Sequence, residues 1–162
     1  MTEVSVQSLN GTTTIKASII INATSDQVWN ILSKPGNIVN FHPLIKRSYM
    51  VGKPQHGKGA KRHCDLLPMG AMNEQITDWV EGESFTAEVI GGKMLPPYKF
   101  MRGTVKVLAE GNKCKVTFCF KYQLKFGALG KLMDILIIRP QFRKAPPKYV
   151  YGLKKYAEHN SI

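Results

Sequence analysis

Residues 127–159 read GALGKLMDILIIRPQFRKAPPKYVYGLKKYAEH, and their pattern constrains the architecture more than any other part of the sequence. Apolar residues recur in its first half at the spacing of one helical face: Leu129, Leu132, Met133, Leu136 and Ile137. The spacing predicts a long C-terminal helix whose apolar face closes a pocket over a curved sheet. Pro140 and the pair Pro146-Pro147 should divide it into two or three pieces, because proline donates no backbone hydrogen bond and crowds the previous turn. In the last piece, the residues expected to face the core are Val150, Leu153 and Ala157.

Positive charge is concentrated in the second half of the chain. Residues 1–90 hold eight Lys/Arg and eight Asp/Glu, whereas residues 91–162 hold fifteen and three, so the second half carries the whole formal net charge of +12. Such an asymmetry favours an anionic partner, although a basic face also keeps a small protein in solution. The chain lacks a basic-aromatic RNA motif and a recognition helix, which argues against nucleic acid. An anionic membrane surface is the partner retained.

Seven strands are predicted from alternating or β-branched runs, at about 12–22, 44–51, 59–66, 72–80, 85–90, 98–109 and 113–125. The last one alternates cleanly, as an antiparallel strand with one wet face does. Two short helices should follow the first strand. One starts near Thr24 or Ser25 and ends at Pro35-Gly36, and the other spans about 37–41. Segregated strands and helices of this kind indicate an α+β fold.

The composition bounds the class of protein. A chain of 162 residues with 43% apolar residues fits a single domain, residues 1–162. No apolar run is long enough to cross a bilayer, and residues 1–10 lack the features of a secretory signal, so we expect a cytoplasmic protein. The three cysteines form no CxxC pair, and the four histidines have no metal-ligand spacing, so neither a metal nor a cofactor is expected. No P-loop, GxGxxG, GxSxG or HExxH motif occurs.

The runs GKGAKRHCDLLPMGAMNEQITDWVEGESFTAEVIGG and LPPYKFMRGTVKVL resemble the polyketide cyclase/dehydrase branch of the SRPBCC, START-like superfamily. The opening IIINATSDQVWNILSKPGNIVNFHPLI and the terminal GALGKLMDILIIRPQFRKA are similar to the matching parts of that family. The resemblance implies a helix-grip fold. In that fold, a seven-stranded antiparallel sheet wraps a long C-terminal helix and leaves an apolar cavity between them. Members include plant hormone receptors, pollen allergens, lipid carriers, quinone-binding proteins and aromatase/cyclases.

Two Pro/Gly loops, residues 66–70 and 91–97, carry apolar side chains where polar residues are usual. They resemble the gate and latch loops over the cavity of plant abscisic-acid receptors. The residues expected to contact a ligand there are Leu66, Pro68, Met69, Leu95 and Pro96. The alternative is that the leucines tuck onto the rim of the sheet and do nothing else.

Further ligand contacts are expected on the inner face of the sheet and on the helix opposite. The candidates are Phe41, His42, Met72, Phe118, Phe120, Tyr122, Met133, Leu136 and Ile137. Side chains in such positions are ordinarily core, but the resemblance implies that the same face lines the family's cavity. Methionine and aromatic walls accept varied apolar ligands.

Glu74, Arg62 and Tyr122 are the candidates for proton transfer. The resemblance implies that Glu74 points into the cavity, where it would either orient a polar headgroup or act as an acid or base. The alternative is an ion-paired or solvated strand residue.

Three functions therefore remain: binding, transport or sensing of a hydrophobic ligand (a lipid, isoprenoid, quinone or polyketide); a cyclase/dehydrase reaction; or lipid delivery at an anionic membrane. Binding without catalysis is preferred, by a monomer or homodimer.

Overall fold

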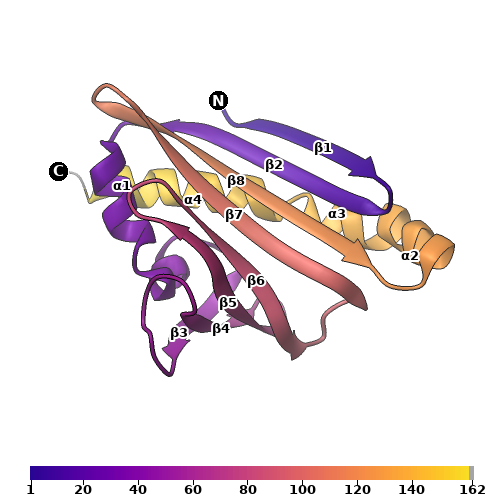
Figure 1. Cartoon of the computed structure of the whole chain (residues 1–162). Helices are drawn as coiled ribbons and strands as arrows, with labels where there is room; N and C mark the ends of the chain where they lie inside the picture. The colour runs from indigo at the N-terminus through magenta and orange to yellow at the C-terminus, as the bar shows by residue number, and fades with distance from the viewer. Residues whose placement is uncertain (161–162) are drawn as a thin grey trace.

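The computed structural model describes residues 1–160 and shows an open antiparallel sheet wrapped around a broken C-terminal helix (Figure 1). The strands are β1 Glu3–Leu9, β2 Thr12–Ile21, β3 Ile45–Val51, β4 Lys61–Leu66, β5 Ala71–Val80, β6 Ser84–Lys93, β7 Tyr98–Glu110 and β8 Lys113–Leu124. Their order in the sheet is β1-β2-β8-β7-β6-β5-β4-β3. The expected α+β helix-grip architecture is confirmed.

The sheet has eight strands, so the prediction of seven is wrong by one. The missed strand is β1, which pairs with β2 from Glu3 to Leu9. The turn between them is Asn10-Gly11, with φ of 51° and 79°. Such left-handed backbone is what a two-residue hairpin turn requires, and Asn-Gly adopts it readily. β1 lies at the edge of the sheet and is exposed except at Val6, so its sequence shows little apolar contrast.

Two short helices follow β2. The first is α1 (Ser25–Leu32), where the hydroxyl of Thr24 accepts from the Gln27 amide and the Gln27 side chain accepts from the Thr24 amide. This reciprocal capping box confirms Thr24 as the cap. The second, the 3₁₀ helix η1 (Pro35–Asn40), begins at the proline that was expected to end the first.

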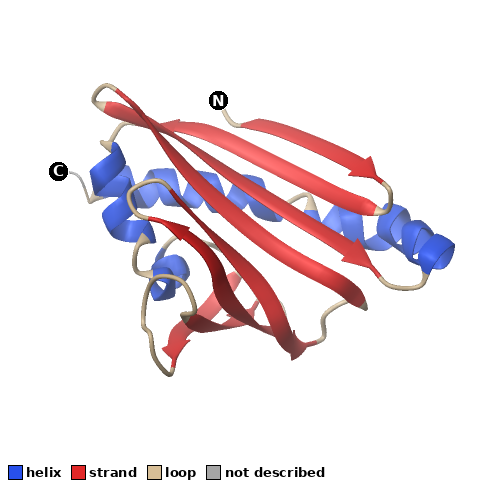
Figure 2. Ribbon diagram, in the orientation of Figure 1, coloured by secondary structure: helices blue, strands red, loops and turns tan. Residues whose placement is uncertain are grey.

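The C-terminal helical region consists of four segments, and a loop at residues 143–144 interrupts it (Figure 2). They are α2 (Gly127–Met133), the π-helical turn η2 (Asp134–Ile138), α3 (Arg139–Phe142) and α4 (Ala145–His159). Prolines stand in the first turns of α3 and α4, where their missing N–H costs nothing. In α4 the predicted core residues Val150, Leu153 and Ala157 are buried. α4 also packs closely on the residue that follows η1, because a Cβ at Gly152 would lie 1.9 Å from the Phe41 carbonyl oxygen.

The short connections define two ends of the sheet (Figure 1). At the α2 end lie the β1–β2, β4–β5 and β6–β7 turns and the junction of β8 with α2, since Ala71 pairs with Lys93 and Tyr98 with Leu124. At the α1 end lie the β5–β6 and β7–β8 turns. A main apolar core fills the space under α1 and α4, and a smaller second cluster lies at the α2 end.

Candidate functional site

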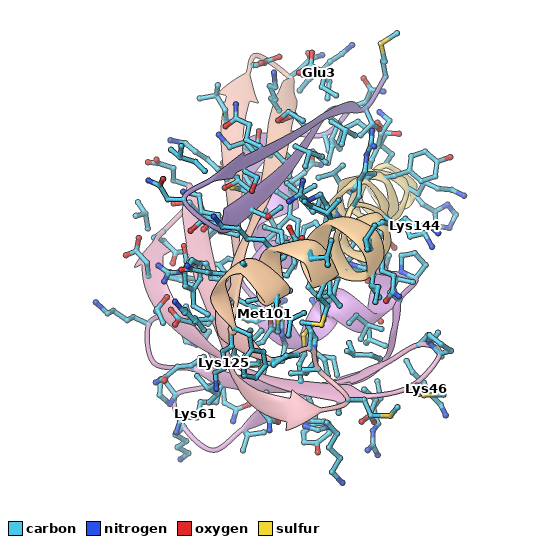
Figure 3. All side chains as sticks on the ribbon, turned by 90° about the vertical axis from the view of Figure 1, so that its right-hand side faces the viewer. Glu3, Lys46, Lys61, Met101, Lys125 and Lys144 are labelled. Atoms are coloured by element: carbon cyan, nitrogen blue, oxygen red, sulfur yellow. The ribbon has the colours of Figure 1, made fainter. Side chains whose placement is uncertain are left out.

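The second apolar cluster lies where the sheet faces the helical segment α2–α3. Its buried centre consists of Ile15, Val89, Met101, Tyr122 and Leu124. Around this centre pack side chains that keep part of their surface accessible: Met72, Leu95, Tyr98, Phe120, Met133, Ile138 and Phe142. Figure 3 views this end and places Met101 beneath the helical segment. The structure thus brings together Met72, Leu95, Phe120, Tyr122 and Met133 from the predicted set.

Asp134 is the polar centre of the same end. Its side chain accepts hydrogen bonds from Thr13 Oγ1 at 2.8 Å and from the Tyr122 hydroxyl at 2.5 Å. Arg139 donates two further hydrogen bonds to the Asp134 carboxylate, from Nε at 3.0 Å and from Nη2 at 2.5 Å. A carboxylate that is only 5% exposed needs such partners, because removing an unpaired charge from water costs several kcal/mol. The cluster ties η2 to β2 and β8.

Tyr122 enters this cluster as a donor. Burial, together with the hydrogen bond to Asp134, raises the pKa of Tyr122 above its ordinary value. The hydroxyl therefore keeps its proton at neutral pH. Because that proton is donated to Asp134, the phenol oxygen can accept a hydrogen bond from a ligand but does not abstract a proton from it.

A hollow of about 130 Å³ opens beside the Asp134 cluster. Its polar lining comes from the β1–β2 turn, β7, β8 and the helical segment, and includes Asn10, Lys99, Tyr122, Lys131, Asp134 and Arg139. α2 lies close to the end of β8 here, since a Cβ at Gly130 would lie 2.0 Å from the Lys125 carbonyl oxygen and 3.6 Å from Leu124 Cβ. The hollow is small, and of the four charged side chains that line it only Asp134 is acidic.

The expectation that the apolar stripe of the helix closes onto the sheet is wrong for most of its members. Leu136 and Ile137 are 66% and 53% exposed, and Leu129 and Leu132 are also exposed. Met133 alone of the stripe packs inward, against the second cluster. Gly130 and Asp134 occupy the inner face instead, because the acid finds three donors there and the glycine permits close approach.

The predicted pair Arg62 and Glu74 lies in the main core, away from Asp134. Arg62 Nη2 and Nε contact Glu74 Oε2 at 2.5 and 2.9 Å, and Nη1 donates to the Pro35 carbonyl at 2.7 Å. The side chains are 5% and 9% exposed. Glu74 thus points inward, as the resemblance implied, but its carboxylate is ion-paired. The pair anchors β4 and β5 to η1.

Phe41, His42 and Phe118 pack around Tyr149 of α4 in the same core. The Phe118 and Tyr149 rings stack with centroids 4.2 Å apart, and the Phe41 ring meets Tyr149 edge-on at 5.2 Å. His42 is 7% exposed. Burial and the positive charges of Arg62 and Lys148 lower the pKa of His42 to about 4, so its ring is neutral at pH 7. These inner candidates contact one another rather than open space.

The two apolar loops lie side by side at the α2 end. A Cβ at Gly70 would lie 3.0 Å from the Lys93 carbonyl oxygen and 3.5 Å from Met94 Cβ. The ligand contacts predicted on these loops differ in burial. Pro68 and Met69 are exposed, whereas Leu66, Leu95 and Pro96 are half-buried. Leu66 packs on the main core and Leu95 on the second cluster. A second, more open hollow of about 520 Å³ is bounded by residues 91–99 and Lys125.

Two features are absent from residues 1–160. Within that range, His, Cys, Asp and Glu form no group of three or more suited to holding a metal ion. The helices of the same residues are too short or too polar for any of them to span a bilayer.

An antiparallel sheet gripping a C-terminal helix, with polar and apolar residues converging between them, defines the helix-grip class of α+β proteins. The family model described as "Polyketide cyclase / dehydrase and lipid transport" matches residues 12–158, and the chain belongs to that family. No curated protein sequence matches the chain significantly.

Solved structures show the same fold at low sequence identity. A norcoclaurine synthase point mutant from Thalictrum flavum, in complex with a transition state analogue, superposes with a TM-score of 0.71 at 17% identity, covering 99% of this chain and 100% of that one. The Zhui aromatase/cyclase from Streptomyces sp. R1128 superposes with a TM-score of 0.72 at 9% identity, covering 93% of this chain and 96% of that one. Major latex-like protein 151 from Panax ginseng superposes with a TM-score of 0.68 at 16% identity, covering 91% of this chain and 99% of that one.

Sequence reasoning missed Thr13, Asp134, Arg139 and Tyr149 as site residues. Asp134 and Arg139 belong to residues 91–162, whose charge was interpreted only as a basic surface. The available signal was their spacing of five residues, which lets the two side chains meet across a π-helical turn. Thr13 carried no local signal, because its role depends on a contact 121 residues away.

Proposed function

We propose that the protein binds a small hydrophobic ligand, such as a lipid, isoprenoid, quinone or polyketide, between the sheet and the segment α2–α3. The observation that carries this proposal is the contrast between the two apolar clusters. Among residues 1–160, the main core has 23 buried side chains surrounded by eight half-buried apolar ones. In the second cluster of the same residues, only five buried side chains are surrounded by eight half-buried ones, which include Phe120 and Met133. Apolar side chains that face inward and still touch solvent favour occupancy by a ligand.

The polar groups of the site have a place in this proposal. The Asp134 cluster supplies a hydroxyl from Tyr122 and a guanidinium from Arg139 at one side of the apolar wall. Such an arrangement fits a ligand with an apolar body and a polar or anionic end. The description of the family, which includes lipid transport, supports the same class of ligand.

Native mass spectrometry of the purified protein, with displacement of an apolar fluorescent dye, tests the proposal. We expect a copurifying apolar molecule, or a dye that binds and is displaced by fatty acids. Met133→Trp should fill part of the site and lower dye affinity roughly tenfold, since an added ring removes the space the dye needs. Leu108→Trp, at a position 56% exposed on β7, is the matched control and should bind as the parent does. The proposal fails if no molecule copurifies and no dye binds, or if both variants behave alike.

A cyclase/dehydrase reaction on a ligand held in this site is the second candidate function. It is favoured by Tyr122, which belongs to the second apolar cluster and lines the small hollow, and whose hydroxyl is held in one orientation by Asp134. Arg62 and Glu74 are weaker candidates for proton transfer, because their side chains form a buried ion pair with each other. Incubation with a reactive polyketone chain, followed by product analysis, tests it. Tyr122→Phe should abolish turnover while leaving ligand binding in place, and unchanged turnover would contradict the role.

A cytoplasmic location is part of the proposal. The three cysteines are free, and a reducing compartment keeps them so.

A further inference from the structure

The outer face of α2 and η2 is apolar. We define the outer stripe as Leu129, Leu132 and Leu136, which follow one another at the three- and four-residue spacing of one helical face and are 67%, 53% and 66% exposed. Ile135, beside the stripe, is 55% exposed. The polarity of the segment is thus the reverse of the usual one, with the acid inside and the leucines in solvent. Contiguous exposed apolar residues on a folded protein mark a surface that contacts something else.

The turns around the stripe continue the same surface. Phe126, at the junction of β8 and α2, is 63% exposed, and Leu9, beside the β1–β2 turn, is 74% exposed. Met69 and Met94, on the two loops that lie side by side, are 61% and 71% exposed. The strand pairing places all four at the α2 end of the sheet. Large apolar side chains therefore project from several separate elements toward the same end of the molecule.

Lysines accompany this apolar end, and unpaired acids do not. Lys99, Lys125 and Lys131 lie on or beside the hollows there, and none of them forms an ion pair with any residue that the structure describes. The acids of this end, Asp65 and Asp134, are each bound to an arginine. The exposed glutamates belong to the other end, where the β5–β6 and β7–β8 turns lie.

We propose that the α2 end docks onto an anionic lipid bilayer. The leucines of the outer stripe and Phe126 enter the boundary between headgroups and acyl chains, while Lys125 and Lys131 contact the anionic headgroups. Apolar residues flanked by lysines on one helical face are the features that hold a protein in the bilayer interface. A second copy of this chain fits less well, because a symmetric contact would bring the same unpaired lysines together.

Flotation with vesicles tests the proposal. Vesicles of phosphatidylcholine alone are compared with vesicles of phosphatidylcholine and phosphatidylglycerol, and we expect binding to the mixed vesicles that weakens as salt is added. The double variant Leu132→Gln, Leu136→Gln should lower the partition coefficient roughly tenfold or more, because two side chains no longer leave water. The double variant Lys125→Gln, Lys131→Gln should lower it about fivefold per lysine.

Matched changes at the α1 end provide the control. Leu108→Gln and Lys113→Gln replace an equally exposed leucine and a lysine near the β7–β8 turn, and the combined variant should bind vesicles as the parent does. Every substituted position is exposed, so all variants should keep the thermal stability of the parent.

Three results would overturn the proposal. They are equal binding to both kinds of vesicle, undiminished binding by the leucine double variant, and a dimer in lipid-free solution that the leucine double variant abolishes. The last result would assign the outer stripe to contacts between copies of the chain. Dye binding inside the sheet is measured separately, so loss of docking and loss of ligand binding are distinguishable.

Discussion

Replacing Asp134 by alanine tests how strongly the buried acid holds the helical segment on the sheet. The change leaves the hydroxyls of Thr13 and Tyr122, both 1% exposed, without their acceptor. Arg139 loses its ion pair, but its side chain is 27% exposed and can turn toward water. Alanine favours the helix by a few tenths of a kcal/mol over aspartate, so any loss of stability comes from the broken contacts.

The expected loss in the free energy of unfolding is roughly 3–5 kcal/mol. Each buried polar group left unpaired costs about 1–3 kcal/mol, and the exposed arginine adds little. A domain of this size has a stability of roughly 5–15 kcal/mol, so the variant should unfold at a clearly lower urea concentration. Equilibrium unfolding in urea, followed by circular dichroism and tryptophan fluorescence, measures the difference.

Two comparisons decide whether the reasoning holds. Leu136→Ala, on the outer face of the same segment, should change the stability by less than about 0.5 kcal/mol. Tyr122→Phe should destabilise the parent but stabilise the Asp134→Ala variant, because it then removes an unpaired hydroxyl. A loss below about 1 kcal/mol for Asp134→Ala, or equal effects of Tyr122→Phe in both backgrounds, would refute the account.

Three further outcomes are expected. Arg62→Ala should cost roughly 3–5 kcal/mol in urea unfolding by leaving the buried Glu74 charge unpaired, and Arg62→Met combined with Glu74→Leu should recover most of it. Because the pKa of His42 is about 4 in the folded protein and its ordinary value is 6.5, the unfolded chain binds a proton that the native ring does not. Stability should therefore fall by about 1 kcal/mol per pH unit between pH 6.5 and 5, and His42→Gln should flatten that slope; an unchanged slope would contradict the assignment. Burial raises the pKa of the Cys64 thiol to about 11, so the native protein should react slowly with Ellman's reagent at pH 8 and show all three thiols only in urea.

The sheet was largely predictable because the alternation of apolar and polar residues is visible within the sequence of each buried strand. On β8 the inward residues Cys114, Val116, Tyr122 and Leu124 are buried as the alternation indicated. The edge strand β1 was missed, since an exposed strand needs no apolar contrast; its only clear signal was the Asn10-Gly11 turn.

The candidate site was less predictable, because periodicity shows that a helix has an apolar face but not which way that face turns. The outer stripe has the spacing of a core face and lies in solvent. The orientation of α2 and η2 is determined by Asp134, which faces the sheet and whose hydrogen-bond partners come from β2, β8 and α3. Contacts that join distant parts of the chain have no local pattern, so a single sequence cannot reveal them.

The π-helical turn η2 amounts to a one-residue insertion in a helix, and this has a consequence for how the family can vary. Each residue of an α-helix advances the side-chain direction by about 100°. The wider π-helical turn takes up the extra residue locally, so α2 and α3 keep their relative orientation, and Asp134 and Arg139 face each other although they are five residues apart. An extra residue in a regular α-helix would instead rotate everything beyond it by that angle. The family can thus absorb a change of a single residue in length at η2 while the outer stripe and the strands stay in place.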